Sequence, residues 1–189
     1  MNHYTRRYGV RLLSVFYKER AEIVRFRIAT LEDLPRLAAL RWAFRTEEGE
    51  TPIEDQGAFA HRYQTFVRDA LASGQWTYWV AETAHSELVA HMAVSIVRSI
   101  PRPSHMQDQW GYLTDCYTRP TFRNQGVGQQ LLTHVVAWAV AQDLEMLLVW
   151  PSEQSQSFYA RAGFGRDNEV RMLRLRDYDA AAPTAPLTI

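Results

Sequence analysis

The sequence predicts an α/β (α+β) fold with a single mixed central β-sheet that is flanked by helices. Apolar residues alternate over short segments and recur at helical spacing over longer ones, in the order β, α, α, β, β, β, α, β, α, β. A glycine-rich turn, Arg123-Asn124-Gln125-Gly126-Val127-Gly128, lies between the fourth strand and the helix that follows it. The continuous apolar run from Met146 to Trp150 is typical of a buried parallel strand. No internal repeat is visible, so we expect one domain over residues 23–176.

The composition excludes several classes of protein. Nearly half of the 189 residues are apolar, and 21 basic residues balance 21 acidic ones, so nothing favours nonspecific binding to nucleic acid. Cys116 is the only cysteine, which rules out an intrachain disulfide and indicates a reducing, cytoplasmic compartment. No apolar run approaches the ~20 residues of a membrane helix, and the basic start of the chain lacks the cleavage site of a signal peptide. The six histidines lack metal-ligand spacing, so we expect no metal, no membrane and no nucleic acid as partners.

The expected elements follow from periodicity and from helix and turn signals. Residues 1–22 show no clear period and are predicted to form an N-terminal arm, and the Ala/Pro-rich residues 177–189 a flexible tail. Thr30 and Asp33 form a predicted capping box, with Asp33 where Glu or Gln is usual. The predicted strands are 23–29, 76–82, 88–100, 112–118, 146–150 and 170–175, and the predicted helices are 34–46, 53–72, 129–142 and one that starts at 151–152 and ends at 162–164.

The glycine-rich turn has the properties of an anion site. Gly126 and Gly128 let the backbone approach a ligand without a Cβ atom in the way. The free N–H groups at the start of the following helix point at such a ligand, and the helix dipole favours negative charge there. Arg123 adds a cation that can bind the same phosphate. We therefore expect a pyrophosphate ligand.

Three kinds of site use a strand, a glycine turn and a helix, and the neighbouring residues separate them. A nucleotide-hydrolase P-loop needs Lys and then Ser or Thr after its last glycine, but Gln129 follows Gly128 here. A dinucleotide fingerprint needs a third glycine where Leu131 stands, and an acid near the end of the next strand, whereas Glu145 lies at that strand's start. The third arrangement, Arg-x-x-Gly-x-Gly, resembles the acyl-CoA loop of the GNAT superfamily of N-acetyltransferases.

Further stretches are similar to that superfamily, and the order of predicted elements matches its fold. They are Ile28-Ala29-Thr30-Leu31-Glu32-Asp33-Leu34, Cys116-Tyr117-Thr118-Arg119-Pro120 and Phe158-Tyr159-Ala160-Arg161-Ala162-Gly163-Phe164. The resemblance covers about residues 23–175 and implies strands that splay around a bound acyl-CoA.

The resemblance also implies acetyl-CoA as the co-substrate. Its cofactor-binding positions fall on Cys116, Tyr117, Thr118, Arg123, Asn124, Gln125, Gly126, Val127, Gly128, Gln129, Ser152 and Tyr159. Two residues depart from the family pattern: Ser152 stands where Asn is common and makes fewer hydrogen bonds, and Thr118 replaces a more usual Val.

Acyl transfer from a thioester to an amine needs a neutral amine, a polarised carbonyl and a protonated leaving thiolate. The resemblance assigns the catalytic proton donor to Tyr159; the alternative is a core aromatic that packs beside Phe158 and Phe164. A backbone N–H between Cys116 and Thr118 is the candidate oxyanion donor, because the family bulges this strand and pairs it with the pantetheine arm. The Cys116 side chain is expected to be a small buried group and not a nucleophile.

Carboxylates provide the candidate acceptor site. Asp115 is the only carboxylate on the strand before the turn. Three roles are open to it: general base, binding of the substrate cation, or a hydrogen-bonded structural residue. Glu47, Glu48 and Glu50 lie between the first two predicted helices, in the loop that borders the acceptor pocket in this family. They either attract a cationic amine or form a solvated acidic loop.

These residues lead to three hypotheses about function. The first is an N-acetyltransferase that transfers the acetyl group of acetyl-CoA to a primary amine, of a small molecule or of a peptide amino terminus or lysine, by direct attack in a ternary complex. The second is a catalytically weak GNAT-like module that binds acyl-CoA and regulates a partner; Tyr159 favours the first and Ser152 the second. The third, a structural or interaction protein, is disfavoured by the intact anion loop. For the enzyme we expect a monomer or homodimer.

Overall fold

The computed structural model describes residues 23–104, 106 and 108–165, and the predicted strand over 170–175 lies outside them. The chain forms two compact units, Met1–Leu148 and Val149–Ile189. The first unit contains the sheet, the glycine-rich turn and three α-helices. Within residues 149–165, the described part of the second unit, there are two short helical segments, which are described with the candidate site.

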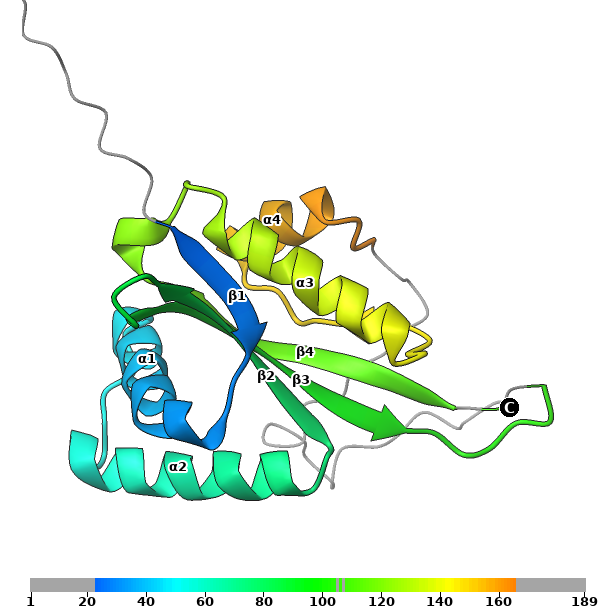
Figure 1. The fold of residues 1–189 in the computed structure, drawn as a ribbon, viewed down its shortest axis with the longest axis horizontal. Helices are drawn as coiled ribbons and strands as arrows, with labels where there is room; N and C mark the ends of the chain where they lie inside the picture. The colour runs from blue at the N-terminus through cyan, green and yellow to red at the C-terminus, as the bar shows by residue number, and fades with distance from the viewer. Residues whose placement is uncertain (1–22, 105, 107, 166–189) are drawn as a thin grey trace, which may run out of the picture. The chain divides into compact units, whose positions relative to one another are not determined.

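In the described part of the first unit the sheet has five strands, in the spatial order β1-β2-β3-β4-β5. Antiparallel neighbours are β1 (Val24–Ile28), β2 (Trp76–Thr83), β3 (Leu88–Arg98) and β4 (Gln109–Thr118), and β5 (Leu147–Leu148) runs parallel to β4. The sheet is therefore mixed, which confirms the prediction. One face is covered by α1 (Leu34–Glu47) and α2 (Gln56–Ala72), and the other by α3 (Val127–Ala141) (Figure 1).

Apolar side chains pack the helices against both faces of the sheet. Under α1 and α2, the buried side chains of Leu37, Leu40 and Val67 belong to one cluster with Val80 and Ala93 of the sheet. On α3 the buried side chains recur at helical spacing, as an amphipathic helix requires; they include Leu131, Leu132 and Val135. Burying one Leu or Val side chain stabilises a fold by about 1.5–3 kcal/mol, so this packing fixes both helix layers.

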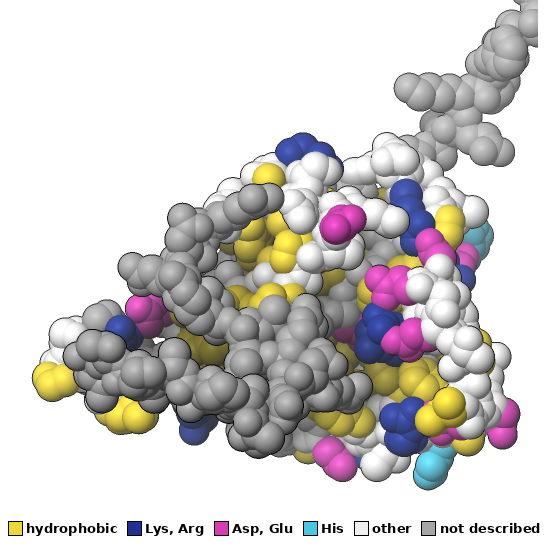
Figure 2. All heavy atoms as spheres, turned by 180° about the vertical axis from the view of Figure 1, so that it is seen from behind, with side chains coloured by type: hydrophobic (Ala, Val, Ile, Leu, Met, Phe, Trp, Pro, Cys, Tyr) yellow, Lys and Arg dark blue, Asp and Glu magenta, His cyan; other side chains and the backbone are white. Residues whose placement is uncertain are grey.

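Acidic and basic side chains lie close together on part of the surface. On the face drawn in Figure 2, Lys and Arg side chains lie beside Asp and Glu side chains. Ion pairs on the surface include Arg45 with Glu48 and Arg62 with Glu54. The zero formal net charge of the sequence is thus matched by local neutralisation between neighbouring side chains.

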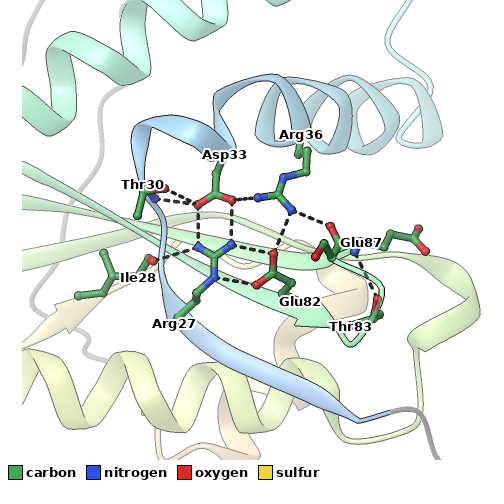
Figure 3. Close-up of polar contacts among 9 residues, drawn as sticks. Arg27, Ile28, Thr30, Asp33, Arg36, Glu82, Thr83 and Glu87 are labelled. Atoms are coloured by element: carbon green, nitrogen blue, oxygen red, sulfur yellow. Dashed lines mark hydrogen bonds and ion pairs between the residues drawn. The ribbon is translucent and has the colours of Figure 1, made fainter.

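A closed network of charged side chains joins β1, the start of α1 and β2 (Figure 3). Asp33 accepts two hydrogen bonds from Arg27, at 2.7 and 2.9 Å, and Arg27 also donates to Glu82 through Nε and Nη2. Arg36 bridges Asp33 and Glu82. The backbone N–H of Thr30 donates to Asp33 Oδ2 at 2.7 Å, and the predicted capping box is formed. Two arginines and two carboxylates neutralise each other at the start of α1.

The structure shifts several predicted boundaries. α2 starts at Gln56 and not at 53, because Asp55 caps it by accepting the N–H of Ala58 at 2.9 Å. α3 starts two residues before the predicted 129, because Gly126 takes the N-cap position. The predicted strand 146–150 is shorter, since β4 pairs with β5 at only two positions. Short 3-10 turns, Leu31–Asp33 (η1) and Pro120–Phe122 (η2), precede α1 and the glycine-rich turn.

Candidate active site

The glycine-rich turn opens α3 with backbone N–H groups that no helical carbonyl accepts. Gly126 is the N-cap residue, and its carbonyl accepts the N–H of Gln130 at 2.9 Å. The N–H groups of Val127, Gly128 and Gln129 come before that bond, so they have no acceptor within the helix. Three N–H groups at the positive end of a 15-residue helix form the kind of site that binds phosphate groups.

Left-handed backbone at two positions shapes this turn. Asn124 has φ 59° and Gly126 has φ 81°. Among residues with a Cβ atom, Asn and Asp tolerate this region best, and glycine adopts it without strain. A Cβ atom on Gly126 would lie 3.5 Å from Gln130 Nε2, which is an ordinary contact. A side chain at position 126 would therefore strain the backbone and obstruct a ligand, without a clash in the free protein.

Arg123, at the start of the turn, is held by Glu47 at the end of α1. Its Nη1 and Nη2 lie 2.6 and 3.0 Å from the two Glu47 oxygens, and its Nε donates to the Thr118 carbonyl at 2.9 Å. The Tyr117 hydroxyl donates to Glu47 at 3.0 Å. The hydrogen bonds from Arg123, followed by that from Tyr117, lower the pKa of Glu47. A contact between Glu47 and a cationic amine, as the sequence suggested, would compete with this ion pair.

Glu48 and Glu50 also bind an arginine of α1. Both accept hydrogen bonds from Arg45, Glu48 from Nη1 and Glu50 from Nη2. The hydrogen bond from Arg45 lowers the pKa of Glu50. The same loop borders a surface pocket with aromatic walls and charged edges, lined by residues that include Trp42, Arg45, Glu50, Phe59 and Arg62. The acidic loop is thus neutralised by Arg45 and still forms one edge of a pocket.

A β-bulge interrupts β4 next to the turn. Ala93 of β3 pairs with Thr114, and His91 pairs with Tyr117, so β4 advances three residues where β3 advances two. Asp115 lies within the bulge and has φ 51°, a conformation that Asp tolerates. The bulge is the feature that the family resemblance implied for this strand.

Beside the bulge, β4 and β5 separate. Their parallel pairing ends at Tyr112 and Leu148, and no later residue of β4 pairs with β5 in the part of the chain that the structure describes. The strands approach closely at Gly111, where a Cβ atom would lie 2.5 Å from Leu147 Cδ2. β4 and β5 therefore pack closely at Gly111. The backbone of residues 113–118 has no partner in β5, as expected for splayed strands.

The bulge brings the Asp115 carboxylate to residues of α1, α2 and β3. Arg41 Nη1 lies 2.8 Å from Oδ1, His91 Nε2 lies 3.2 Å from the same oxygen, and the Tyr63 hydroxyl donates to Oδ2 at 3.1 Å. Only 10% of the Asp115 side chain is exposed. Burial works to raise the pKa of Asp115, but the interactions with His91, Arg41 and Tyr63 outweigh it and hold the pKa well below its usual range. Asp115 is therefore charged at neutral pH and a weak proton acceptor.

Sequence reasoning missed these three partners of Asp115. They lie 74, 52 and 24 positions away along the chain, on three different elements. A weak signal existed, because Arg41 continues the apolar face of its helix and His91 interrupts an apolar strand, and buried polar groups usually have a partner. His91 is fully buried, and its Nδ1 has no hydrogen-bond partner among the described residues.

The second unit contains residues 158–164, a stretch that we call the aromatic box. It lies in and directly after α4 (Gln156–Arg161), which follows the 3-10 turn Glu153–Ser155 (η3). The α-helix thus starts later than the predicted 151–152. The N–H of Phe164 donates to the Tyr159 carbonyl and that of Gly163 to the Ala160 carbonyl, both at 3.1 Å, and Gly163 has φ 90°. This is a Schellman C-cap, which explains the spacing Tyr-x-x-x-Gly-Phe.

The ring of Tyr159 is buried and meets Phe158 and Phe164 edge-on, with centroids 5.0 and 5.5 Å away. The packing role proposed as the alternative for Tyr159 is therefore present, and it does not conflict with a proton-donor role. Ser152 precedes η3, and its hydroxyl lies 3.1 Å from the hydroxyl of Ser155.

The structure groups the predicted site residues by unit. The first unit holds Glu47, Glu48, residues 115–118 and residues 123–129, and the second holds Ser152 and Tyr159. Within residues 23–104, 106 and 108–165, no group of His, Cys, Asp and Glu side chains has the arrangement of a metal site. No helix of that same part is long and apolar enough to cross a membrane.

The bulged β4, its separation from β5 and the glycine turn before α3 together define a GNAT-type fold. The sequence profile of the acetyltransferase (GNAT) family matches residues 34–164, from the first residue of α1 to the end of the aromatic box. The chain therefore belongs to the GNAT acetyltransferase family. No curated protein matches the sequence.

Solved structures of acetyltransferases share this fold. A predicted acetyltransferase from Clostridium acetobutylicum, solved with acetyl-CoA, is 23% identical and covers 82% of this chain and 99% of its own, with a TM-score of 0.70. A GCN5-related N-acetyltransferase from Ralstonia eutropha is 25% identical over 80% of this chain and 98% of its own, with a TM-score of 0.65. Glucosamine-6-phosphate N-acetyltransferase from Arabidopsis thaliana is 16% identical over 82% of this chain and 100% of its own, with a TM-score of 0.63. The fold predicted from the sequence is confirmed.

Proposed function

We propose that the protein is an acetyl-CoA-dependent N-acetyltransferase that acts on a primary amine. The observation that carries the proposal is the start of α3, where the N–H groups of Val127, Gly128 and Gln129 are available to a pyrophosphate. The family match supports the same co-substrate, and so does the similar protein from Clostridium acetobutylicum that was solved with acetyl-CoA. The amine belongs to a small molecule, or to a peptide amino terminus or lysine.

In the proposed reaction both substrates are bound together and the amine attacks directly. The amine nitrogen forms a bond to the thioester carbonyl carbon while a backbone N–H of residues 116–118 donates to the carbonyl oxygen. The C–S bond then breaks, and the leaving thiolate takes a proton from the Tyr159 hydroxyl. The bound ammonium first loses one proton to water and so becomes the neutral nucleophile. The nitrogen loses a second proton as the amide forms, and this proton restores Tyr159 through water. The products are an N-acetyl amine and CoA with a free thiol.

Within this proposal, Asp115 holds the amine and does not take its proton. The low pKa of the carboxylate makes it a poor general base at neutral pH. Its Oδ1 accepts from Arg41 and His91. Among the described residues only Tyr63 donates to its Oδ2, which leaves room for a further donor. Burial, and then the charge of Asp115, raise the pKa of Tyr63, so that hydroxyl stays protonated and continues to donate.

The second candidate is a catalytically weak module that binds acyl-CoA and regulates a partner. One observation favours it: Ser152, which stands in place of the family's Asn, lies within hydrogen-bond distance of the neighbouring Ser155 hydroxyl. Release of the CoA thiol, followed with acetyl-CoA and a panel of primary amines, separates the two. An acetylated product of matching mass supports the enzyme, and acetyl-CoA binding without release for any amine supports the module.

Tyr159→Phe tests the proton donor in this reaction. The change keeps the ring and its contacts with Phe158 and Phe164, so the free energy of unfolding should stay within about 1 kcal/mol. It removes the transferable proton, and we expect kcat and kcat/KM to fall together by about 10²–10⁴-fold. The acetyl-CoA affinity, measured by calorimetry, should change no more than a few-fold. Full activity in a well-folded Tyr159→Phe protein would rule out the role.

A further inference from the structure

We propose that Arg41 and Asp115 form a two-point site for an acceptor amine that also carries a carboxylate or phosphate group. The inference rests on the proposed function, because it names the substrate class of the same site. Asp115 binds the amine, and Arg41 binds the anionic group of the same molecule.

The guanidinium of Arg41 has an unused edge. Arg41 donates from Nη1 to Asp115, and no contact of its Nε or Nη2 is found among the residues that the structure describes. Two other arginines near carboxylates use all three nitrogens: Arg27 donates from Nε and both Nη atoms, and so does Arg123. Nε and Nη2 form the side of the guanidinium that binds two oxygens of a carboxylate or phosphate at once.

Arg41 is also held in one place. Its single contact with Asp115 is to a carboxylate that two further side chains fix, and its guanidinium lies 5.6 Å from the centre of the Phe44 ring. About 30% of the Arg41 side chain is exposed, so a ligand can reach it. Glu50, a neighbouring carboxylate, is already bound by Arg45. A cation that is fixed, reachable and only partly paired is preorganised for an anionic ligand.

The charges of the pair favour a ligand with both signs. Arg41 and Asp115 neutralise each other, so a simple ammonium ion would add an unbalanced positive charge beside Arg41. A ligand with an amine and an anion places each charge next to its opposite and leaves the site neutral. Because Asp115 is nine-tenths buried, an unbalanced charge there costs more than it would in water.

A continuous row of rings connects this pair to the surface pocket. Trp42 and Phe59 line the pocket with their ring centroids 5.4 Å apart. Phe59 stacks on Tyr63 at 5.8 Å, and the Tyr63 hydroxyl donates to Asp115. The ring of Tyr63 is buried in the core, so this row holds Asp115 in place, and the acceptor can contact only the rings at the pocket end, Trp42 and Phe59.

Two matched pairs of amines test the substrate class on the full chain with acetyl-CoA. Phenylalanine is compared with phenylalaninamide, and O-phosphoethanolamine with ethanolamine, in wild type and in Arg41→Gln. Intrinsic amine reactivity cancels because each probe is compared with itself in the two proteins. We expect kcat/KM for at least one anionic probe to fall about 10- to 100-fold in Arg41→Gln. For its partner without the anionic group, kcat/KM should stay the same or rise, because the Asp115 charge is then free to balance the ammonium. The pair that responds distinguishes a carboxylate from a phosphate.

Further variants control for charge and folding. Arg41→Lys keeps the positive charge but lacks the Nε and Nη2 pair that can bind two oxygens at once. It should lose part of the preference for the anionic probe over its partner. Arg102→Gln removes an arginine of the β3–β4 loop, which pairs with Asp108, and should leave the preference unchanged. Circular dichroism and acetyl-CoA affinity establish that each variant is folded.

The outcomes decide whether Arg41 binds the anionic group of the acceptor. Equal losses for anionic and neutral probes, or no loss, overturn the two-point site while the proposed acetyl transfer stands. If no probe is acetylated, calorimetry with CoA bound decides: Arg41-dependent binding of an anionic probe supports the site, and the panel of amines in the thiol-release assay then decides the proposed reaction. Lack of such binding for both anionic probes overturns the site.

Discussion

Asp33 and Asp115 are both buried carboxylates that meet arginine, and their surroundings differ in kind. Asp33 is fully buried in the closed network of Figure 3, where the capping N–H of Thr30 and two arginines fill its oxygens. Asp115 is reached by one arginine, a tyrosine and a histidine, in a left-handed conformation inside a bulge. Its arginine keeps a free edge, and its histidine keeps an unpartnered nitrogen among the described residues.

The two carboxylates differ in role: the charge of Asp33 stabilises the fold, and the charge of Asp115 lies where a ligand can use it. Around Asp33, both carboxylate oxygens and all three nitrogens of Arg27 bind other parts of the fold, so the network joins β1, α1 and β2. Around Asp115, hydrogen-bonding capacity remains next to the strand edge that β5 leaves. Open capacity in a buried, strained position is typical of a functional site, and full satisfaction is typical of a structural one.

The largest expected effect is on stability, in Asp33→Asn. The change removes the charge that neutralises Arg27 and Arg36, and breaking such a buried pair costs about 3 kcal/mol or more. Urea unfolding should show that loss, with kcat/KM per folded molecule within about 2-fold of wild type. Asp69→Asn, an exposed site on α2, is the matched control and should change stability by less than about 0.5 kcal/mol. A stability loss no larger than that of the control would mean that the network is not structural.

For Asp115→Asn we expect the opposite pattern, a small loss of stability and a large loss of activity. Asn tolerates the left-handed backbone, and Arg41 is exposed enough to be solvated, so we expect a stability loss of about 1 kcal/mol. The lost charge no longer holds the amine, and kcat/KM should fall about 10- to 100-fold in the thiol-release assay. Normal turnover with a large loss of stability would place Asp115 in the same class as Asp33.

The contribution of Asp33 to stability should also be lost in acid, and this effect is smaller than that of Asp33→Asn. Burial works to raise the pKa of Asp33, but the Arg27 hydrogen bonds and the Thr30 N–H outweigh it and lower the pKa to about 2. Because the pKa is depressed in the folded protein, its contribution to stability is complete above about pH 4 and is lost as pH falls toward 2. Wild type should lose about 2 kcal/mol more than Asp33→Asn over that window. Parallel acid unfolding curves for the two proteins would contradict this cause.

Local signals in the sequence predicted the capping box at Asp33 and much of the fold. Thr30 and Asp33 are three residues apart, so their capping box was predictable from spacing. The same holds for the glycine turn before α3 and for the Tyr-x-x-x-Gly-Phe box, since both are helix-end motifs within a few residues. The order of strands and helices follows from periodicity for the same reason.

The surroundings of Asp115 depend on distant pairing. A single extra residue in β4 changes the course of the strand, and no local pattern states where β3 and β4 lose register. Arg41, Tyr63 and His91 come together only when α1, α2 and β3 are packed. The ion pair between Arg123 and Glu47 was missed for the same reason, because the two residues are 76 positions apart.

Binding of acetyl-CoA at the start of α3 is tested most directly by calorimetry on two glycine variants. Gly126→Asp introduces a side chain and a negative charge at φ 81°, beside the N–H groups proposed to bind the pyrophosphate. Gly74→Asp makes the same change at φ 67°, where a Cβ atom meets nothing within 4 Å, so backbone strain and added charge are matched. We expect acetyl-CoA affinity to fall at least about 10-fold in Gly126→Asp and to stay at the wild-type value in Gly74→Asp. Wild-type affinity in a folded Gly126→Asp protein, or equal losses in both variants, would contradict a pyrophosphate site at this helix.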